Sequence, residues 1–369
     1  MVLWGSAAMT ILRGTGNLLE ANVDALVNTV NTVGVMGKGI ALQFKKAFPE
    51  NYKAYRKACD RGEVVPGRMF IFPTGQLVPR LIVNFPTKRH WRQPSRLEDI
   101  RAGLVDLARV IAEFDIKRIA VPPLGVGNGG LDWGKVRPLI VDALGGIDGL
   151  TVHLFEPGHA PQAQEMPVAP TRVKMTPTRA ALLLAFENYL ERVFALGRLE
   201  AQKLIYFLSE SGQNFPKLKF EKAQFGPYAE VVNHMLTTMD GKLIRGFGDR
   251  NQRSDITVLR DALTAACDLA SHEPSVTDRV TRVMDLIEGY EGLYGLELLA
   301  SVHWAAKHDL AAAGSPEAAR AAVQAWNPRK RARYSADDIE AAWRHLSDHG
   351  WIGADAVRRN AAMADQSTV

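Results

Sequence analysis

The sequence predicts two domains of different class, an α/β domain with a mixed, largely parallel sheet between helices and then a mostly α-helical domain. In residues 9–157, short β-rich runs alternate with helical patterns, which is typical of a parallel sheet. Residues 158–175 are rich in Pro, Ala and Gln without periodicity, so we expect a linker. Residues 176–354 carry mainly helical patterns, and residues 355–369 are expected to form a flexible tail.

Six strands and two well-marked helices are expected in the first domain. Ser95 and Glu98 form a capping-box pattern ahead of apolar residues at helical spacing from Ile100 to Ile111. Asp132 suits the N-cap of a helix over Trp133–Leu144. The expected strands are Ile11–Arg13, Ala25–Thr29, Met69–Phe72, Leu81–Phe85, Arg118–Pro122 and Thr151–Phe155.

The second domain shows helix start and stop signals throughout. Thr176 and Pro177 open a helix that we expect to stop at Gly197, and Ser335 and Asp338 begin the last clear helix. The other expected helices are Leu199–Ser211, Ala229–Met239, Ser275–Ile287, Leu293–Leu310 and Ala336–His345.

Composition limits the class of protein. With 369 residues, 47% of them hydrophobic, the chain can bury two large cores. Its two cysteines, Cys59 and Cys267, lie far apart, so we expect neither a disulfide framework nor a zinc site, and no metal or cofactor. Without a secretory or membrane-spanning pattern, a soluble cytoplasmic protein is expected. The net charge of +5 permits an anionic partner.

The segment Val27–Ala41 predicts a phosphate-binding loop. A strand ending in Asn28 and Asn31 leads through glycines into a helix that begins near Gly39, so backbone amides and the helix dipole can meet an anion. Lys38 invites comparison with a Walker A loop, but Gly39 stands where that motif needs Ser or Thr for magnesium.

A second glycine loop, Pro123–Leu131, also lies between an expected strand and a helix. Its Gly125, Gly127 and Gly130 satisfy the GxGxxG pattern, but that turn normally follows the first strand, and this one follows the fifth. An NAD dehydrogenase is therefore not expected. Either loop alone could be a tight turn without a ligand, and two such loops in one domain favour phosphate binding.

These motifs resemble those of the macrodomains, over about residues 9–157. VNTVN at Val27–Asn31 is similar to the family's VNAAN signature, and Asn17 stands where most members have an aspartate that accepts a hydrogen bond from adenine. An asparagine carbonyl is a weaker acceptor. The resemblance implies ADP-ribose binding by Asn17, Leu18, Asn28, Asn31, Gly34, Met36, Gly37, Lys38, Gly39 and Thr87, and by the second loop, Gly125, Val126, Gly127, Asn128, Gly129, Gly130 and Leu131.

Between the loops, NFPTKRHWR at Asn84–Arg92 gathers basic side chains. One interpretation is a solvated basic edge. A second interpretation is nucleic-acid binding, in which Trp91 stacks on an exposed base. Trp91 could equally be a structural residue that covers the next helix. In a third interpretation Lys88 is a catalytic residue. Neighbouring positive charges would lower the pKa of Lys88 and yield a neutral amine able to attack an anomeric carbon. The candidate DNA-binding residues are Arg89, His90, Trp91 and Arg92.

This segment resembles the catalytic stretch of the terminal ADP-ribose glycohydrolase branch of macrodomains, which includes the DarG antitoxins. The catalytic lysine of the branch falls on Lys88, and Gly129 stands where eukaryotic members have an assisting aspartate. DarG proteins remove the ADP-ribose that a DarT toxin attaches to thymidine in single-stranded DNA. The resemblance therefore implies a hydrolase for ADP-ribosylated single-stranded DNA, with Lys88 either attacking or polarising the ribose, and Asn28 and Asn31 orienting it.

The second domain offers no catalytic pattern of its own. KLIYFL at Lys203–Leu208 and FGPY at Phe225–Tyr228 resemble helical SocA-like antitoxin domains, and the DarG resemblance implies that this domain binds a DarT-type ADP-ribosyltransferase toxin. A basic cluster over Arg329–Arg333 suits either DNA contact or a solvated loop. The rival hypothesis for the whole chain is a non-catalytic ADP-ribose-binding module attached to a helical adaptor domain.

Overall fold

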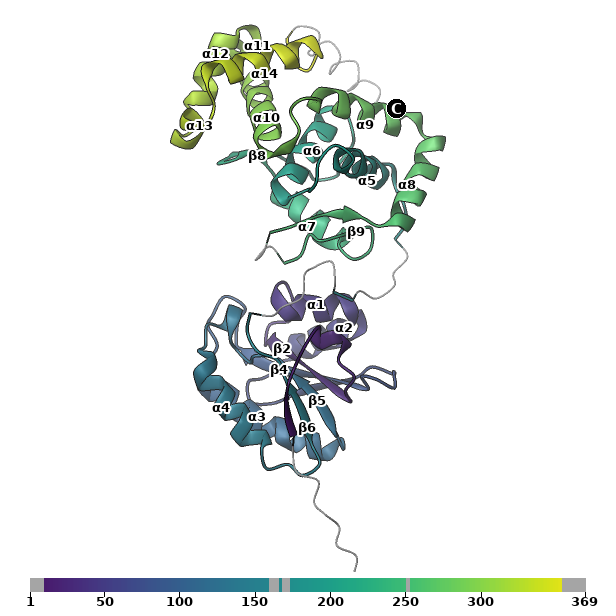
Figure 1. The fold of residues 1–369 in the computed structure, drawn as a ribbon, viewed down its shortest axis with the longest axis vertical. Coiled ribbons are helices and arrows are strands. Elements are labelled where there is room, and N and C mark those ends of the chain that lie inside the picture. The colour runs from purple at the N-terminus through teal and green to yellow at the C-terminus, as the bar shows by residue number, and fades with distance from the viewer. Residues whose placement is uncertain (1–9, 159–165, 168–172, 250–252, 354–369) are drawn as a thin grey trace, which may run out of the picture. The chain divides into compact units, whose positions relative to one another are not determined.

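The computed structural model describes residues 10–158, 166–167, 173–249 and 253–353. The chain divides into two compact units, residues 1–170 and 171–369 (Figure 1). Within the expected linker, Met166 is buried in the core of the first unit, and Val173 and Met175 pack against the core of the second. The expected tail, residues 355–369, lies outside the described residues, and the domain limits stay predictions.

The first unit contains all six expected strands in one sheet, with strand order β1-β6-β5-β2-β4-β3. Every neighbouring pair is parallel except β3 with β4, which confirms the mixed, largely parallel sheet. The strands are β1 (Thr10–Arg13), β2 (Ala25–Asn31), β3 (Phe70–Pro73), β4 (Leu81–Lys88), β5 (Arg118–Val121) and β6 (Thr151–Leu154).

Helices cover both faces of this sheet. Because side chains alternate along a strand, Ala25 and Val27 of β2 face the core formed with α3 (Leu97–Glu113) and α4 (Trp133–Leu144). Leu26 faces the opposite core, which includes Phe44 of α1 (Gly39–Ala47), and α2 (Pro49–Asp60) packs beside α1. The sheet is therefore apolar on both faces, as expected of a largely parallel sheet.

The second unit is helical around one large core, with two short antiparallel hairpins. Its first helix ends at Leu190 rather than at Gly197 as expected, and the helix over 260–272 was not anticipated. The helices are α5 (Pro177–Leu190), α6 (Arg198–Glu210), α7 (Glu230–Met239), α8 (Arg260–His272), α9 (Pro274–Ile287), α10 (Gly292–His308), α11 (Leu310–Gly314), α12 (Pro316–Gln324), α13 (Pro328–Arg333) and α14 (Ala336–Asp348), and the hairpins are β7 (Glu221–Ala223) with β8 (Gly226–Tyr228) and β9 (Ile244–Arg245) with β10 (Thr257–Val258).

Two expected helix N-caps are present in the structure, and a third is not. Asp132 accepts a hydrogen bond from Gly134 N at 2.9 Å, and Ser335 forms a capping box with Asp338. The expected capping box of Ser95 and Glu98 is wrong. The N-cap of α3 is Arg96, and Ser95 N instead donates to Gly129 O at 2.9 Å.

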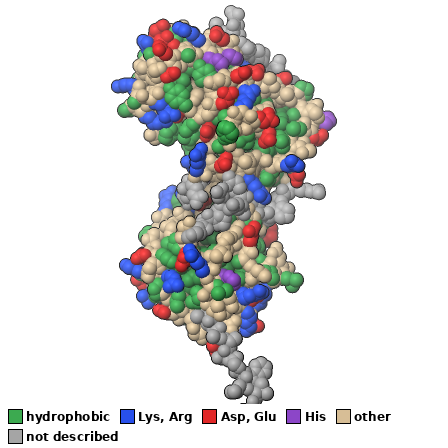
Figure 2. Space-filling model, viewed as in Figure 1, with side chains coloured by type: hydrophobic (Ala, Val, Ile, Leu, Met, Phe, Trp, Pro, Cys, Tyr) green, Lys and Arg blue, Asp and Glu red, His purple; other side chains and the backbone are tan. Residues whose placement is uncertain are grey.

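Within the described residues, none of the helices has the length and apolar character needed to span a membrane. The same residues contain no group of three or more His, Cys, Asp or Glu side chains able to hold a metal ion. On the face drawn in Figure 2, acidic and basic side chains are interspersed over both units.

One carboxylate joins β2 to β5 and should make stability depend on pH. Asp24 accepts hydrogen bonds from Lys117 N at 2.9 Å and Arg118 N at 2.8 Å. Burial raises the pKa of Asp24, but these hydrogen bonds and the charge of Arg118 outweigh it and lower the pKa below its usual value. The stabilisation is therefore present above the unfolded-state pKa and is lost as the pH falls through the folded-state pKa.

We expect Asp24→Ala to destabilise the first unit by about 2 kcal/mol at pH 7, because two amides lose a charged acceptor. Calorimetry of the full chain at pH 7 and pH 3 should give a smaller difference from the unmodified protein at pH 3. An equal loss of stability at both pH values would contradict this account.

Candidate functional site

Three connections leave the same edge of the sheet, because β2, β4 and β5 are parallel. We call residues 32–38 after β2 the first loop, residues 89–92 after β4 the lip, and residues 122–131 after β5 the second loop. The predicted site residues lie toward or after the carboxyl ends of these strands, apart from Asn17 and Leu18, which follow β1. The sheet therefore gathers segments that are distant in sequence.

A register shift sets the position of Lys88. Val30 pairs with Pro86, but Asn31 pairs with Lys88, so β4 contains one extra residue, Thr87. Pro86 lacks a backbone donor, and it is tolerated here because β3 pairs with β4 only as far as Asn84. The shift brings Lys88 opposite the last residue of β2, beside the two glycine loops.

Lys88 contacts the second loop directly. Its Nζ donates a hydrogen bond to the backbone carbonyl of Asn128. The side chain of Asn128 in turn reaches the start of α1, since a Cβ atom on Gly39 would lie 3.0 Å from Asn128 Nδ2. Lys88, the second loop and the start of α1, which follows the first loop, therefore meet at one place.

The pKa of Lys88 is lowered, as expected, but the expected cause is wrong. Burial lowers this pKa, and the charge of Arg89 is not the cause. Arg89 turns toward α3, where Nη2 lies 3.0 Å from Asp99 Oδ1 and Nε lies 3.2 Å from Asp99 Oδ2. Because Asp99 compensates the guanidinium charge, desolvation is the physical reason that favours the neutral amine.

Asn28 is fully buried, in a network of amides beneath the site. Its Nδ2 donates to Asn84 Oδ1 at 2.9 Å, and Asn84 Nδ2 donates to Asn51 Oδ1 of α2 at 2.8 Å. Asn28 is thus linked to β4 directly and to α2 through Asn84. Asn51 and Asn84 were not anticipated, although a polar residue within the apolar run of β4 was a visible signal.

Asn31 shapes the first loop. Its Oδ1 accepts hydrogen bonds from Val33 N and Val35 N, and its Nδ2 donates to Val35 O at 2.6 Å. The hydroxyl of Tyr55, a buried residue of α2, donates to Asn31 O at 2.5 Å. Tyr55 was missed by the sequence analysis because it lies outside the motifs and becomes a neighbour only when α2 packs on the sheet.

Other predicted binding residues divide into buried and exposed groups. Asn17 caps a short 3-10 turn at Leu18–Glu20, with its Oδ1 accepting from Leu19 N at 3.1 Å. The side chains of Leu18, Met36 and Thr87 are buried.

Positive φ angles, which favour glycine, occur at Gly34, Gly39, Gly125, Gly127 and Gly130. The exposed members are Gly37, Lys38, Gly127, Asn128 and Gly130, whereas Gly34, Gly125 and Gly129 are buried and Gly39, Val126 and Leu131 are half-buried.

The lip presents a stacked cluster to solvent. Trp91 is 46% exposed, with the guanidinium of Arg92 4.5 Å from its ring centre and the ring of His90 stacked at 5.5 Å. Thr32 Oγ1 donates to Arg89 O at 2.6 Å and ties the lip to the first loop. An exposed indole can stack on a base, with Arg92 beside it for a phosphate.

The second unit contains a buried cluster of charges around Glu297. Lys330, fully buried, donates to Glu297 Oε1 at 2.8 Å, and Arg329 donates to the same atom at 2.6 Å. Two members of the expected basic cluster are therefore paired inside this unit. Lys203 donates to Pro227 O at 2.7 Å, and burial lowers its pKa to about 7, helped by the charge of Lys330. The cluster holds the turn of the FGPY motif.

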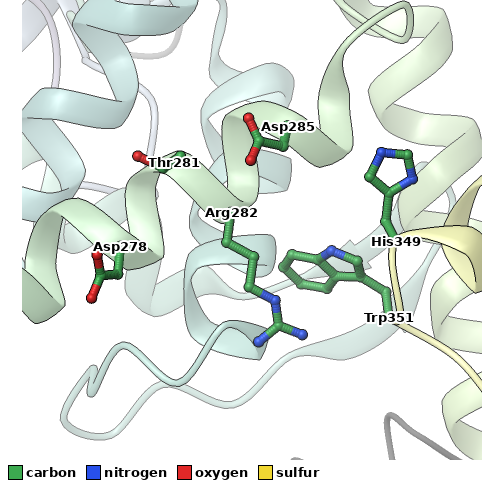
Figure 3. Close-up of a pocket in the computed structure, with 6 residues that line it drawn as sticks. All are labelled: Asp278, Thr281, Arg282, Asp285, His349 and Trp351. Atoms are coloured by element: carbon green, nitrogen blue, oxygen red, sulfur yellow. The ribbon is translucent and has the colours of Figure 1, made fainter.

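A pocket of about 290 Å³ also lies in the second unit (Figure 3). The guanidinium of Arg282 covers the ring of Trp351 at 4.6 Å. None of the predicted site residues lines this pocket, which is formed by Asp278, Thr281, Arg282, Asp285, His349 and Trp351.

The family model for the Macro domain matches residues 27–140. Two curated relatives, from Thermus aquaticus and Mycobacterium tuberculosis, are both named DNA ADP-ribosyl glycohydrolase. They are 52% and 45% identical over 85% and 90% of this chain, and over 87% and 97% of their own lengths. The solved macrodomain of Mycobacterium tuberculosis DarG is 56% identical and covers 41% of this chain and 99% of its own, with a TM-score of 0.40.

We expect Tyr55→Phe to weaken ADP-ribose binding by about three- to tenfold, because the first loop loses a buried hydrogen bond beneath Asn31. Calorimetric titration with ADP-ribose measures the change. Tyr52→Phe is the matched control on the same helix, since the Tyr52 hydroxyl accepts from Arg56 instead. Equal affinities for the two variants would show that the Tyr55 hydroxyl does not set the loop.

Proposed function

This chain belongs to the family of DNA ADP-ribosyl glycohydrolases, the DarG proteins, and is a hydrolase; from that premise we propose that it removes ADP-ribose from thymidine in single-stranded DNA. We also propose that residues 176–354 bind the cognate DarT-type toxin, so that one chain reverses the modification and restrains its source. The protein acts in the cytoplasm under this proposal.

The observation that carries the hydrolase proposal is the contact of Lys88 with the second loop, whose Asn128 side chain lies beside Gly39 at the start of α1. Under this proposal the backbone amides of the loops bind the phosphates of ADP-ribose, and the second loop, which Lys88 contacts, holds the distal ribose. Desolvation favours its neutral form, which can attack the anomeric carbon, whereas its ammonium form can polarise the ribose. Asn31 contributes by fixing the first loop, and Asn28 by fixing β2.

The lip supports DNA as the substrate. Trp91 is exposed and lies against the guanidinium of Arg92, next to the end of β4 that carries Lys88. A single-stranded thymidine could stack on the indole while Arg92 and His90 approach flanking phosphates. Since Arg92 covers one side of the ring in this structure, we propose that it moves when the base binds.

The toxin-binding proposal rests on the relatives and on the second unit. The relatives at 52% and 45% identity span both units, and a relative from Thermosipho africanus is named as a fusion of a DNA ADP-ribosyl transferase with a DNA ADP-ribosyl glycohydrolase. The second unit carries its own core and a hairpin anchored by buried charges. Such a unit can present a preformed surface to a partner.

We expect Lys88→Ala to lower the turnover of thymidine-ADP-ribosylated oligonucleotide by about a hundredfold or more, with ADP-ribose affinity nearly unchanged. Released ADP-ribose and calorimetric titration measure the two quantities. Undiminished turnover would remove Lys88 from the mechanism. If the unmodified protein binds ADP-ribose but releases none from this oligonucleotide, the rival hypothesis of a non-catalytic binding module is favoured.

Lys88→Arg separates the two roles of the lysine. Arginine keeps the positive charge but does not become neutral in proteins. Activity near that of the unmodified protein would favour polarisation of the ribose, whereas loss comparable to Lys88→Ala would favour the neutral amine.

A chain truncated after residue 175 should lose the toxin while keeping ADP-ribose binding, because the second unit is removed and the first keeps its own cores. Copurification with the toxin and titration with ADP-ribose measure both properties. If the truncated chain copurified with the toxin as well as the full chain does, the proposed role of residues 176–354 would be wrong.

A further inference from the structure

Ser95 has a buried hydroxyl with no hydrogen-bond partner among the residues that the structure describes. The residue is 6% exposed and lies between the lip and α3. Its hydroxyl is not used as a helix cap, because Arg96 holds that position. Leaving a buried hydroxyl unpaired is unfavourable, so this group points to a partner that arrives in another state of the protein.

The second loop rests directly on Ser95. Ser95 N donates to Gly129 O at 2.9 Å. A Cβ atom on Gly129 would lie 2.4 Å from Ser95 Oγ, and one on Gly125 would lie 3.0 Å from Ser95 Cβ. The loop can pass this closely only because both positions are glycine. Ser95 thus occupies the space that any side chain at position 129 would need.

Lys88 also lies close to Gly129. Its Nζ donates to the carbonyl of Asn128, and its Cε lies 3.9 Å from where a Cβ of Gly129 would stand. The hydroxyl of Ser95 and the side chain of Lys88 are therefore both close to the position that a Cβ of Gly129 would occupy. An ammonium has three donors, and the Asn128 carbonyl occupies one of them.

Burial, and not a neighbouring charge, is the cause of the lowered pKa of Lys88. The second loop is uncharged from Pro123 to Leu131, and β2 contributes Asn31. Arg89 of the lip is paired with Asp99 of α3. A neutral acceptor close to Lys88 therefore has a direct effect on where the amine points.

We propose that Ser95 is a positioning residue for Lys88, whose hydroxyl accepts a hydrogen bond from Lys88 Nζ when ADP-ribose occupies the second loop. The ligand displaces the amine from the Asn128 carbonyl, and Ser95 keeps it directed at this loop. The hydroxyl is thus unpaired in the free protein and paired in the complex. This inference rests on the proposed role of Lys88.

Ser95→Ala tests the proposal, because it keeps Cβ in contact with the loop and removes only Oγ. The pKa of Lys88 is measured by NMR in full-length protein labelled at the ε-carbon of lysine, with Lys88→Ala identifying the signal. Without ligand, we expect the Lys88 pKa to be the same in the unmodified protein and in the Ser95→Ala variant. With ADP-ribose bound, the Lys88 pKa should be lower by about 0.5 in Ser95→Ala, since an acceptor that favours the ammonium is missing.

Kinetics and stability provide two further readouts. On thymidine-ADP-ribosylated oligonucleotide, we expect Ser95→Ala to lower kcat by about tenfold while KM stays within about twofold, because orientation rather than binding is lost. The melting temperature should be unchanged or higher, because the variant removes an unpaired buried hydroxyl.

Equal Lys88 pKa values in the two ADP-ribose complexes would overturn the proposal. So would a lower melting temperature with equal pKa values, which would make Ser95 structural. The pKa measurement needs only ADP-ribose, so it decides the role of Ser95 even if the unmodified protein leaves the oligonucleotide intact. That last result would instead refute the proposed substrate.

Discussion

In the first unit β2 and β4 run parallel with Asn28 opposite Asn84, and the positions of the site residues follow from this alignment. A slip of one residue would turn every side chain of one strand to the other face of the sheet. Asn28 or Asn84 would then enter the apolar core shared with α3 and α4, without an amide partner. The hydrogen bond from Asn28 to Asn84 needs this register, so it favours it, and the hydrogen bond from Asn84 to Asn51 extends the same constraint to α2.

The same helix connects the sheet to the first loop. Asn51 contacts β4, and Tyr55, one turn later, contacts the end of β2 at Asn31. Asn31 then holds the backbone of Val33 and Val35. A loop that binds phosphate through backbone amides must be ordered before the ligand arrives, since ordering it later would reduce affinity. The series from Asn51 to Val35 provides that order without any charged group.

Elements that depend on local chemistry could be predicted from the sequence, whereas features that depend on tertiary contacts could not. The six strands, the helix start at Gly39 and the cap at Asp132 follow from patterns of a few residues. Ser335 caps α14 as expected, whereas α3 begins one residue too late for Ser95 to be its N-cap, and the Ser95 amide donates to Gly129, 34 positions later in the chain. Likewise the adjacency of Lys88 and Arg89 suggested mutual repulsion, and the partner that removes it, Asp99, is a feature of the folded helix.

An enzyme of this kind without an acid in its second loop must control its lysine by other means. Burial favours the neutral amine, and the hydrogen bond to the Asn128 carbonyl favours the ammonium, so these two effects oppose each other in the free protein. A ligand that takes the amine from that carbonyl removes one of them. Gly129 is what allows the carbonyl, Ser95 and Lys88 to meet so closely, because any side chain there would collide with Ser95. The missing acid and the close packing around Lys88 are therefore consequences of the same glycine.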